Sequence, residues 1–301
     1  GLELVCSTNS TLRGNVIDSN EYNVGVGGEV LSHFMHSIDV SNLVNGKPIY
    51  YLINKKDVVI SPSTYQQVGY LALINSTNIR VENLTLTNNL QGLLLAYTNN
   101  SRILGSNITN NEFCGVNLQS CSNDSIYENS IKANRFHGVF LTYSSNNTIQ
   151  GNNITEHGLE TDGIGDGIRL TSSNHNHIFG NNITNNWNGI GFYESSNNSI
   201  VANNITANIH CGIILWGYSN GNSIEENNIT NKNHYGIVIS HSSGNSIVGN
   251  NVTANDYYGI YLGDCTNSII SGNSITNNEW GIHITGSSGN NVSDNTISGN
   301  N

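Results

Sequence analysis

Apolar and polar residues alternate in short runs along most of the chain, and these runs return at a nearly constant interval. In each repeat a glycine is followed by apolar residues one and three positions later, as in Ile237 and Ile239. Such period-two pairs, bounded by Gly, Ser and Asn, predict short β-strands, because a helix would need apolar residues at 3.6-residue spacing. The marker glycines lie 22 to 24 residues apart except for one interval of 29, at Gly92, Gly115, Gly138, Gly167, Gly189, Gly212, Gly236, Gly259 and Gly281.

The repeat predicts an all-β solenoid. About 23 residues with three strands and three turns suit one coil of a parallel β-helix, in which coils stack at about 4.8 Å. We expect roughly 11–13 coils in a single domain, residues 1–301. Residues 21–68 leave the pattern and are expected to form an irregular decorated insertion. The 29-residue interval predicts a lengthened loop within one coil at residues 156–166.

Asparagine recurs at fixed places in the repeat. In a parallel β-helix such residues lie over one another, so their amides can pair along the axis, in left-handed turn conformations that asparagine tolerates. We therefore predict Asn ladders at the turns. One ladder comprises Asn129, Asn152, Asn181, Asn203, Asn227, Asn250, Asn273 and Asn295. A second column comprises Asn111, Asn134, Asn186, Asn208, Asn255, Asn278 and Asn300.

The repeated phrase, seen as "GNNITNNWNGI" and "GNNVTANDYYGI", resembles that of the NosD-like group of carbohydrate-binding and sugar-hydrolase β-helix proteins. Residues 44–89 also resemble a stretch of archaeal cell-surface proteins. The resemblance covers most of the chain and implies a right-handed parallel β-helix. It implies less about function, since this fold carries lyases, hydrolases, epimerases, adhesins and envelope subunits.

Composition indicates an exported protein without a nucleic-acid partner. Ten Lys and Arg against 21 Asp and Glu give a net charge of -11, which disfavours binding to phosphate backbones. No apolar run approaches the length of a membrane span, and none reads as a signal peptide. We expect an extracellular location at the cell surface or envelope. The five cysteines are expected to be free thiols, because equivalent positions lie too many coils apart to pair.

Fourteen Asn-x-Ser/Thr sequons are consistent with a secreted glycoprotein. Asn182, Asn204, Asn228 and Asn251 share one column on consecutive coils, so their side chains should be roughly 5 Å apart. Glycans on all four would collide, and we expect the column to be only partly modified. The glycosylation candidates are Asn75, Asn83, Asn107, Asn153, Asn182, Asn204, Asn228, Asn251 and Asn291.

The segment around the long interval carries the candidate chemistry. Its phrase "TEHGLETDGIGDGIRL" alternates acidic residues with glycine, which suits a calcium loop with ligands from Asp162 and Asp166. If the protein is an enzyme, the catalytic candidates are Asp162, Asp166 and Arg169, because glycoside hydrolysis needs two nearby carboxyl groups. "TDGI" resembles part of a polygalacturonase signature, but the other signatures of that family and of alginate epimerases are absent. Residues 157 to 177 also contain His157, Glu160, His175 and His177.

These observations favour a structural role over catalysis. Neither end of the sequence shows a cap, so we expect polymerisation through open β-helix ends, with Leu2–Leu4 of one copy meeting the last coil of another. We therefore predict a subunit of an archaeal surface layer or sheath. No cofactor is expected apart from calcium, because a single Met and scattered His residues offer few soft ligands for copper. The alternative is a module that binds or cleaves cell-surface polysaccharide through residues 157–177.

Overall fold

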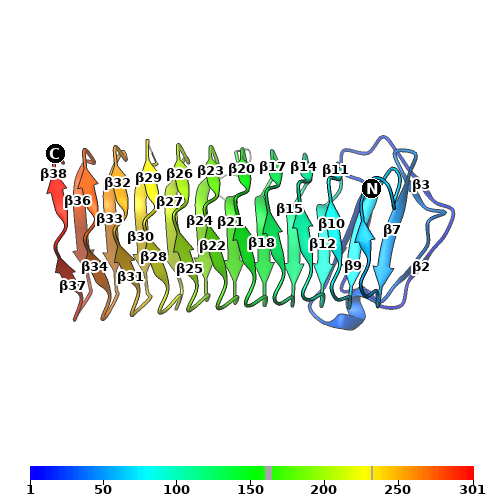
Figure 1. Ribbon diagram of the computed structural model, residues 1–301, viewed down its shortest axis with the longest axis horizontal. Helices are drawn as coiled ribbons and strands as arrows, with labels where there is room; N and C mark the ends of the chain where they lie inside the picture. Colours follow the sequence, from blue (N-terminus) through cyan, green and yellow to red (C-terminus); the bar gives the residue numbers. More distant parts are fainter. Residues whose placement is uncertain (160–164, 232) are drawn as a thin grey trace.

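The chain forms an elongated parallel β-helix of about 13 turns with about 23 residues in each (Figure 1). The structure is a computed structural model that describes residues 1–159, 165–231 and 233–301. Three long sheets run along the axis, and their strands follow one another in sequence order around each coil. The predicted fold class is confirmed. In the described residues, no helix has the length and apolar character of a membrane span.

The largest sheet has 13 strands, and its members from β9 onward pair in parallel. Its strands are β3 (Val16–Ile17), β6 (Leu43–Val44), β7 (Lys47–Ile53), β9 (Tyr70–Ile74), β12 (Gln91–Ala96), β15 (Cys114–Gln119), β18 (His137–Thr142), β21 (Asp166–Thr171), β24 (Asn188–Tyr193), β27 (Cys211–Trp216), β30 (Tyr235–Ser240), β33 (Tyr258–Gly263) and β36 (Trp280–Thr285).

The second sheet has 11 strands. These are β8 (Val59–Ile60), β10 (Arg80–Glu82), β13 (Arg102–Leu104), β16 (Ser125–Tyr127), β19 (Thr148–Gln150), β22 (His177–Phe179), β25 (Ser199–Val201), β28 (Ser223–Glu225), β31 (Ser246–Val248), β34 (Ile269–Ser271) and β37 (Asn291–Ser293). The third sheet has ten. These are β11 (Thr85–Thr87), β14 (Asn107–Thr109), β17 (Ser130–Lys132), β20 (Asn153–Thr155), β23 (Asn182–Thr184), β26 (Asn204–Thr206), β29 (Asn228–Thr230), β32 (Asn251–Thr253), β35 (Ser274–Thr276) and β38 (Thr296–Ser298).

The interior is a stack of aliphatic side chains. In β24, Ile190 and Phe192 point inward, and Ile200 and Ile205 of the same coil meet them from the other two sheets. Each is 0–1% exposed, and the register places every one over its counterpart in the next coil. Burying one such side chain contributes about 1.5–3 kcal/mol. The period-two pattern therefore reflects real burial on one face of each strand.

The first 46 residues form two short coils, the N-terminal unit, which is joined to the 13-stranded sheet through β3 and β6. Strand β1 (Leu2–Val5) pairs with β4 (Val24–Gly27), and β2 (Thr11–Leu12) pairs with β5 (Ser37–Ile38). The 3₁₀-helix η1 (Leu31–Phe34) connects β4 to β5. Their apolar residues form a second core with outward side chains of β9 and β12, such as Tyr70 and Leu94. The sequence predicts that Leu2–Leu4 lie at the end of the solenoid, whereas β1 pairs with β4 in a two-stranded sheet.

Two asparagine columns run through the turns, as hydrogen bonds show. Asn203 donates its backbone N–H and Nδ2 to Oδ1 of Asn227, at 2.9 and 3.0 Å, and accepts the same pair of bonds from Asn181. Ladder asparagines of this kind are nearly fully buried. The expected left-handed backbone belongs instead to the residue before the rung, as at Ala202 with φ 52° and Gly180 with φ 62°. We call each ladder residue a rung. Its backbone N–H points along the axis, because it donates to the side chain of the next rung.

A third polar column, unexpected from the sequence, precedes the 11-stranded sheet. It runs through Ser101, Asp124, Asn147, Asn176, Asn198, Asn222, Asn245, Ser268 and Asn290, each donating its N–H to the next side chain. A fourth column is made of serines, and Cys121 and Cys265 replace serine in it. Cys121 Sγ contacts the carbonyl oxygens of Leu95 and Gln119, as Ser144 Oγ contacts those of Leu118 and Thr142. All five thiols are free.

Candidate functional site

Asp166 lies on the outer face of the 13-stranded sheet, where it is nearly buried. Its Oδ1 accepts from Nδ2 of Asn188 at 2.8 Å, and its Oδ2 pairs with Nη1 of Arg169 at 3.2 Å. Its backbone N–H donates to Nδ1 of His137 at 3.1 Å. Burial lowers the pKa of His137 to about 4, so its imidazole is neutral and accepts this bond. The carboxylate is thus held by the guanidinium and an amide.

Arg169 is held in place by its neighbours in adjacent coils. It pairs in register with Phe140 on one side and with Gly191 on the other. A Cβ at position 191 would overlap Oδ2 of Asp166, so glycine makes room for the ion pair. The guanidinium lies 5.9 Å from the ring centre of Tyr193, and 28% of the side chain is exposed. The positions of Phe140 and Gly191 on either side of Arg169 follow from the register of the repeats.

The remaining residues of the 157–177 cluster do not join this ion pair. His157 is buried in an asparagine column, while His175 is exposed in a turn and His177 stacks on Phe179 of the 11-stranded sheet. Glu160 and Asp162 lie outside the described residues. Asp166 has both oxygens engaged, one by Asn188 and one by Arg169. The catalytic and calcium hypotheses also involve Asp162, which lies outside the described residues, so both stay predictions.

His157 takes an asparagine's place in the second column. Its Nδ1 accepts the backbone N–H of Asn134 at 3.0 Å, which leaves the proton on Nε2 to donate to the carbonyl oxygen of Ile131 at 3.1 Å. Its own N–H donates to Oδ1 of Asn186. Burial lowers its pKa to about 4, so the ring is neutral at pH 7. Its role in the described structure is that of a rung.

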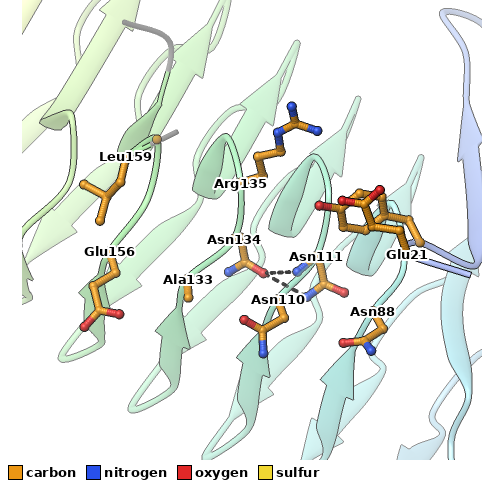
Figure 2. A pocket seen from close by; sticks show the side chains of 11 residues that line it. Glu21, Asn88, Asn110, Asn111, Ala133, Asn134, Arg135, Glu156 and Leu159 are labelled. Atoms are coloured by element: carbon orange, nitrogen blue, oxygen red, sulfur yellow. Dashed lines mark hydrogen bonds between the residues drawn. The ribbon is translucent and has the colours of Figure 1, made fainter. Parts of the chain in front are cut away.

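A groove of about 540 Å³ opens over the turn that leads from the ten-stranded sheet to the 13-stranded sheet (Figure 2). We call this turn the corner; in successive coils its described residues are 88–90, 110–113, 133–136, 156–159, 185–187, 207–210, 231, 233–234, 254–257 and 277–279. The volume is typical of small-ligand sites. The groove is lined by Glu21, Tyr22, Asn88, Asn110, Asn111, Ala133, Asn134, Arg135, Glu156, Gly158 and Leu159.

The outer wall of the groove comes from the link between the two N-terminal coils. Glu21 and Tyr22 stand on this link, and Figure 2 shows Glu21 and Arg135 projecting from neighbouring segments above the row of turn residues. A smaller hollow of about 350 Å³ shares Glu21 and Tyr22 and reaches Glu112. The fold brings these residues together although the two walls are 66 (Tyr22 to Asn88) to 138 (Glu21 to Leu159) positions apart in sequence.

A polar network ties this wall to the corner. Arg135 Nη1 pairs with Glu112 Oε1 at 2.7 Å, and Tyr22 and Glu112 both line the smaller hollow. Partial burial and Glu112 raise the pKa of Tyr22 to about 12, so the phenol keeps its proton. The second oxygen of Glu112, Oε2, is shielded from solvent and has no hydrogen-bond partner.

Aromatic rings continue along the corner in later coils. Trp187 and His210 lie 5.9 Å apart at 18°, His210 and His234 lie 6.4 Å apart at 20°, and His234 and Tyr257 lie 5.5 Å apart at 7°. The stacked rings cover one another's faces, and Nδ1 of His210 is bonded to the buried Asn188. His234 is exposed and the other three are half-buried. This aromatic row offers apolar edges and polar atoms at the coil spacing.

Neither the groove nor the aromatic row was predicted from the sequence. The row could have been found, because Trp187, His210, His234 and Tyr257 stand two residues before their marker glycines. The groove could not, since it needs the placement of Glu21 and Tyr22 on the main solenoid. No coil periodicity predicts that contact.

The column of sequon asparagines forms its own exposed ladder. Nδ2 of Asn182 donates to Oδ1 of Asn153 at 2.9 Å, and Asn204, Asn228 and Asn251 each donate in the same way to the preceding member at 2.8 to 2.9 Å. Side chains that share such bonds are immediate neighbours. Their modification, like that of Asn75, Asn83, Asn107 and Asn291, stays a prediction.

Comparison with known proteins identifies one family. The family model described as periplasmic copper-binding protein (NosD) matches residues 32–208 and 192–301. No curated protein sequence matches the chain.

Several solved structures share the fold at low sequence identity. The A-module of the mannuronan C-5 epimerase AlgE4 from Azotobacter vinelandii has a TM-score of 0.69 at 15% identity, with 99% of this chain and 84% of that chain covered. A point mutant of the periplasmic alginate epimerase AlgG has a TM-score of 0.67 at 15% identity, with 98% and 74% covered. DFA-IIIase from Arthrobacter chlorophenolicus A6 has a TM-score of 0.54 at 14% identity, with 77% and 60% covered. Such identities establish the β-helix fold alone.

The donor atoms present do not fit a copper site. Copper sites use clustered imidazole, thiolate and thioether ligands. In the described ranges, no three side chains of His, Cys, Asp or Glu converge. One pair of such side chains, His210 Nδ1 with Cys211 Sγ at 3.2 Å, involves a thiol that is fully buried, and burial raises its pKa far above the ordinary value. The chain's one methionine, Met35, is in the N-terminal unit.

Proposed function

The chain belongs to the family described as periplasmic copper-binding protein (NosD), and from that premise we propose that it is a protein of the cell envelope that binds a polysaccharide along the corner. The proposal rests on one observation: the groove and the aromatic row occupy the same turn of successive coils, so they form one linear track parallel to the axis. A linear track with a repeating spacing suits a linear ligand with repeating units.

The chemistry of the track supports this ligand class. Sugar units present apolar C–H patches beside hydroxyl groups, and ring edges with N–H and O–H groups can meet both. Asn88 and Asn110 add amides along the groove, and Arg135 adds fixed donors. Two of the proteins with similar folds, AlgE4 and AlgG, are epimerases of mannuronan or alginate by name. The fold thus carries polysaccharide sites elsewhere, and the corner is where this chain offers one.

Isothermal titration calorimetry with the intact chain tests the proposal. The ligands are hexamers of glucosamine, N-acetylglucosamine and mannuronate. We expect saturable binding of at least one hexamer, lost in a Trp187→Ala/His234→Ala variant. A Trp216→Ala/Tyr218→Ala variant is the matched control, because it removes two exposed rings, 52% and 73% exposed, outside the corner. Absence of binding, or equal loss in both variants with unchanged melting temperatures, would refute a corner site.

A structural role in an archaeal surface layer or sheath is the second candidate. In the last coil, Ile284, Val292 and Ile297 are 39%, 44% and 49% exposed, whereas Leu262, Ile270 and Ile275 beneath them are buried. One further coil, from a longer chain or from a second copy, would cover them. Sedimentation of the wild type and of an Ile284→Lys/Ile297→Lys variant tests self-association through this end. A wild type that stays monomeric at high concentration would count against it.

A further inference from the structure

The charges around the groove carry information about the ligand. Glu21 and Glu156 line the groove, and Glu112 lines the adjoining hollow. The cations nearby are already paired: Arg135 with Glu112 at 2.7 Å, and Lys132 with Glu156 at 3.1 Å. Further along the corner stand Asp256 and then Glu279, just after the aromatic row. The described track therefore has more carboxylates than cations, and the chain as a whole carries a charge of -11.

Glu112 adds negative charge beside the groove without offering an accessible oxygen at Oε2. Its Oε1 accepts from Arg135, and its Oε2 is shielded from solvent. The accessible carboxylates for a ligand ammonium group are therefore those of Glu21 and Glu156. A ligand carboxylate would instead add a like charge next to Glu112, Glu21 and Glu156, which is unfavourable.

We propose that the corner binds an amino-sugar polymer, whose ammonium groups pair with the carboxylates of Glu21 and Glu156, and that it discriminates against uronate polymers. This inference rests on the proposed polysaccharide-binding function. It sets the chain apart from the proteins of similar fold, AlgE4 and AlgG, whose names specify mannuronan or alginate. Glu21 and the paired Glu156 are solvent-accessible, so their attraction should depend strongly on salt.

The test compares three hexamers on the intact chain by calorimetry at low salt. We expect the glucosamine hexamer to bind most tightly, the neutral N-acetylglucosamine hexamer less tightly and the mannuronate hexamer least. A Glu21→Gln/Glu156→Gln variant should weaken glucosamine binding by roughly five- to ten-fold, as expected for two exposed charge pairs, and change N-acetylglucosamine binding little. Raising the salt to about 1 M should reduce the same preference.

A Glu128→Gln/Glu226→Gln variant is the control, because it makes the same change in net charge at exposed turn positions of a different corner. Equal weakening by both double variants would show attraction to the overall charge and overturn the specific site. Tighter binding of mannuronate, lost in Trp187→Ala/His234→Ala, would overturn the ligand class while leaving the proposed function intact. No binding of any hexamer would overturn both.

Discussion

Asp124 donates its backbone N–H to Oδ1 of Asn147 over 2.9 Å, so a carboxyl group occupies a rung that later coils fill with asparagine. Its Oδ1 accepts the N–H of Ser101 at 2.7 Å, but its Oδ2 is buried without a partner. At the next rung the equivalent atom, Nδ2 of Asn147, donates to Oδ1 of Asn176 at 3.1 Å. Burial raises the pKa of Asp124 to about 8, because the column offers its second oxygen no donor.

Asp124→Asn should stabilise the protein increasingly as the pH rises. The folded-state pKa lies above the unfolded value of about 3.9, so the wild type loses stability between about pH 4 and pH 8, by about 1.4 kcal/mol per pH unit at most. The variant lacks this loss. Melting temperatures of both proteins at pH 5 and pH 8 check the prediction, with exposed Asp18→Asn as control. A difference that does not grow with pH would contradict a buried, protonated Asp124.

His157→Asn should have the opposite pH signature. Burial lowers the folded-state pKa of His157 to about 4, below the unfolded value of about 6.5. The stability of the wild type is therefore complete above pH 6.5 and falls as the pH drops toward 4. His137 shares this behaviour, so the variant should lose only part of the acid sensitivity. As a control, His175→Asn changes an exposed turn residue and should leave the dependence of the melting temperature on acid pH unchanged. Equal effects of the two variants would contradict the buried position of His157 in the asparagine column.

Asn203→Ala should be far more destabilising than Asn204→Ala, although the two residues are adjacent. Asn203 bonds to both neighbouring rungs and to the carbonyl oxygens of Ile178 and Val201. Its loss leaves several buried groups without partners, at about 1–3 kcal/mol each. Asn204 belongs to the exposed ladder, where water can replace each bond. Chemical denaturation measures the difference; comparable midpoints for the two variants would contradict the inner ladder's role.

Glycans on the sequon column should exclude one another. Asn182, Asn204 and Asn228 are linked side chain to side chain at 2.8 to 2.9 Å, so adjacent glycans would overlap. We expect glycopeptide mass spectrometry of protein from its natural source to find no molecule with glycans on two consecutive members. A single glycopeptide modified at both Asn204 and Asn228 would disprove this.

The sequence predicts the main solenoid well because each coil repeats the same burial. Ile205, Ile229 and their equivalents fix both the strands and the register, and Asn203 follows from the same count. The third column is harder to recognise in the sequence, because Ser101 and Asp124 occupy positions that asparagine fills in later coils.

The N-terminal unit and the groove are harder to predict, because their contacts do not follow the repeat. Tyr70 and Leu94 alternate like any strand residues, yet their outward side chains are buried by the first 46 residues. That packing places Tyr22 beside Glu112, about 90 positions later in the chain. The repeat register pairs Asp166 with Asn188 and Arg169 with Gly191, but the ion pair between Asp166 and Arg169 depends on side-chain geometry.

Tryptophan fluorescence tests corner binding most directly. The chain has three tryptophans, of which Trp187 lies in the aromatic row. Trp216 is the last residue of β27, at the end of the strand away from the corner. Two single-tryptophan variants are needed, one keeping Trp187 and one keeping Trp216, with phenylalanine at the other positions. On titration with the glucosamine hexamer, the account predicts a saturable change in the emission of Trp187 and none in that of Trp216. A response from Trp216 alone, or from neither variant with any of the three hexamers, would contradict it.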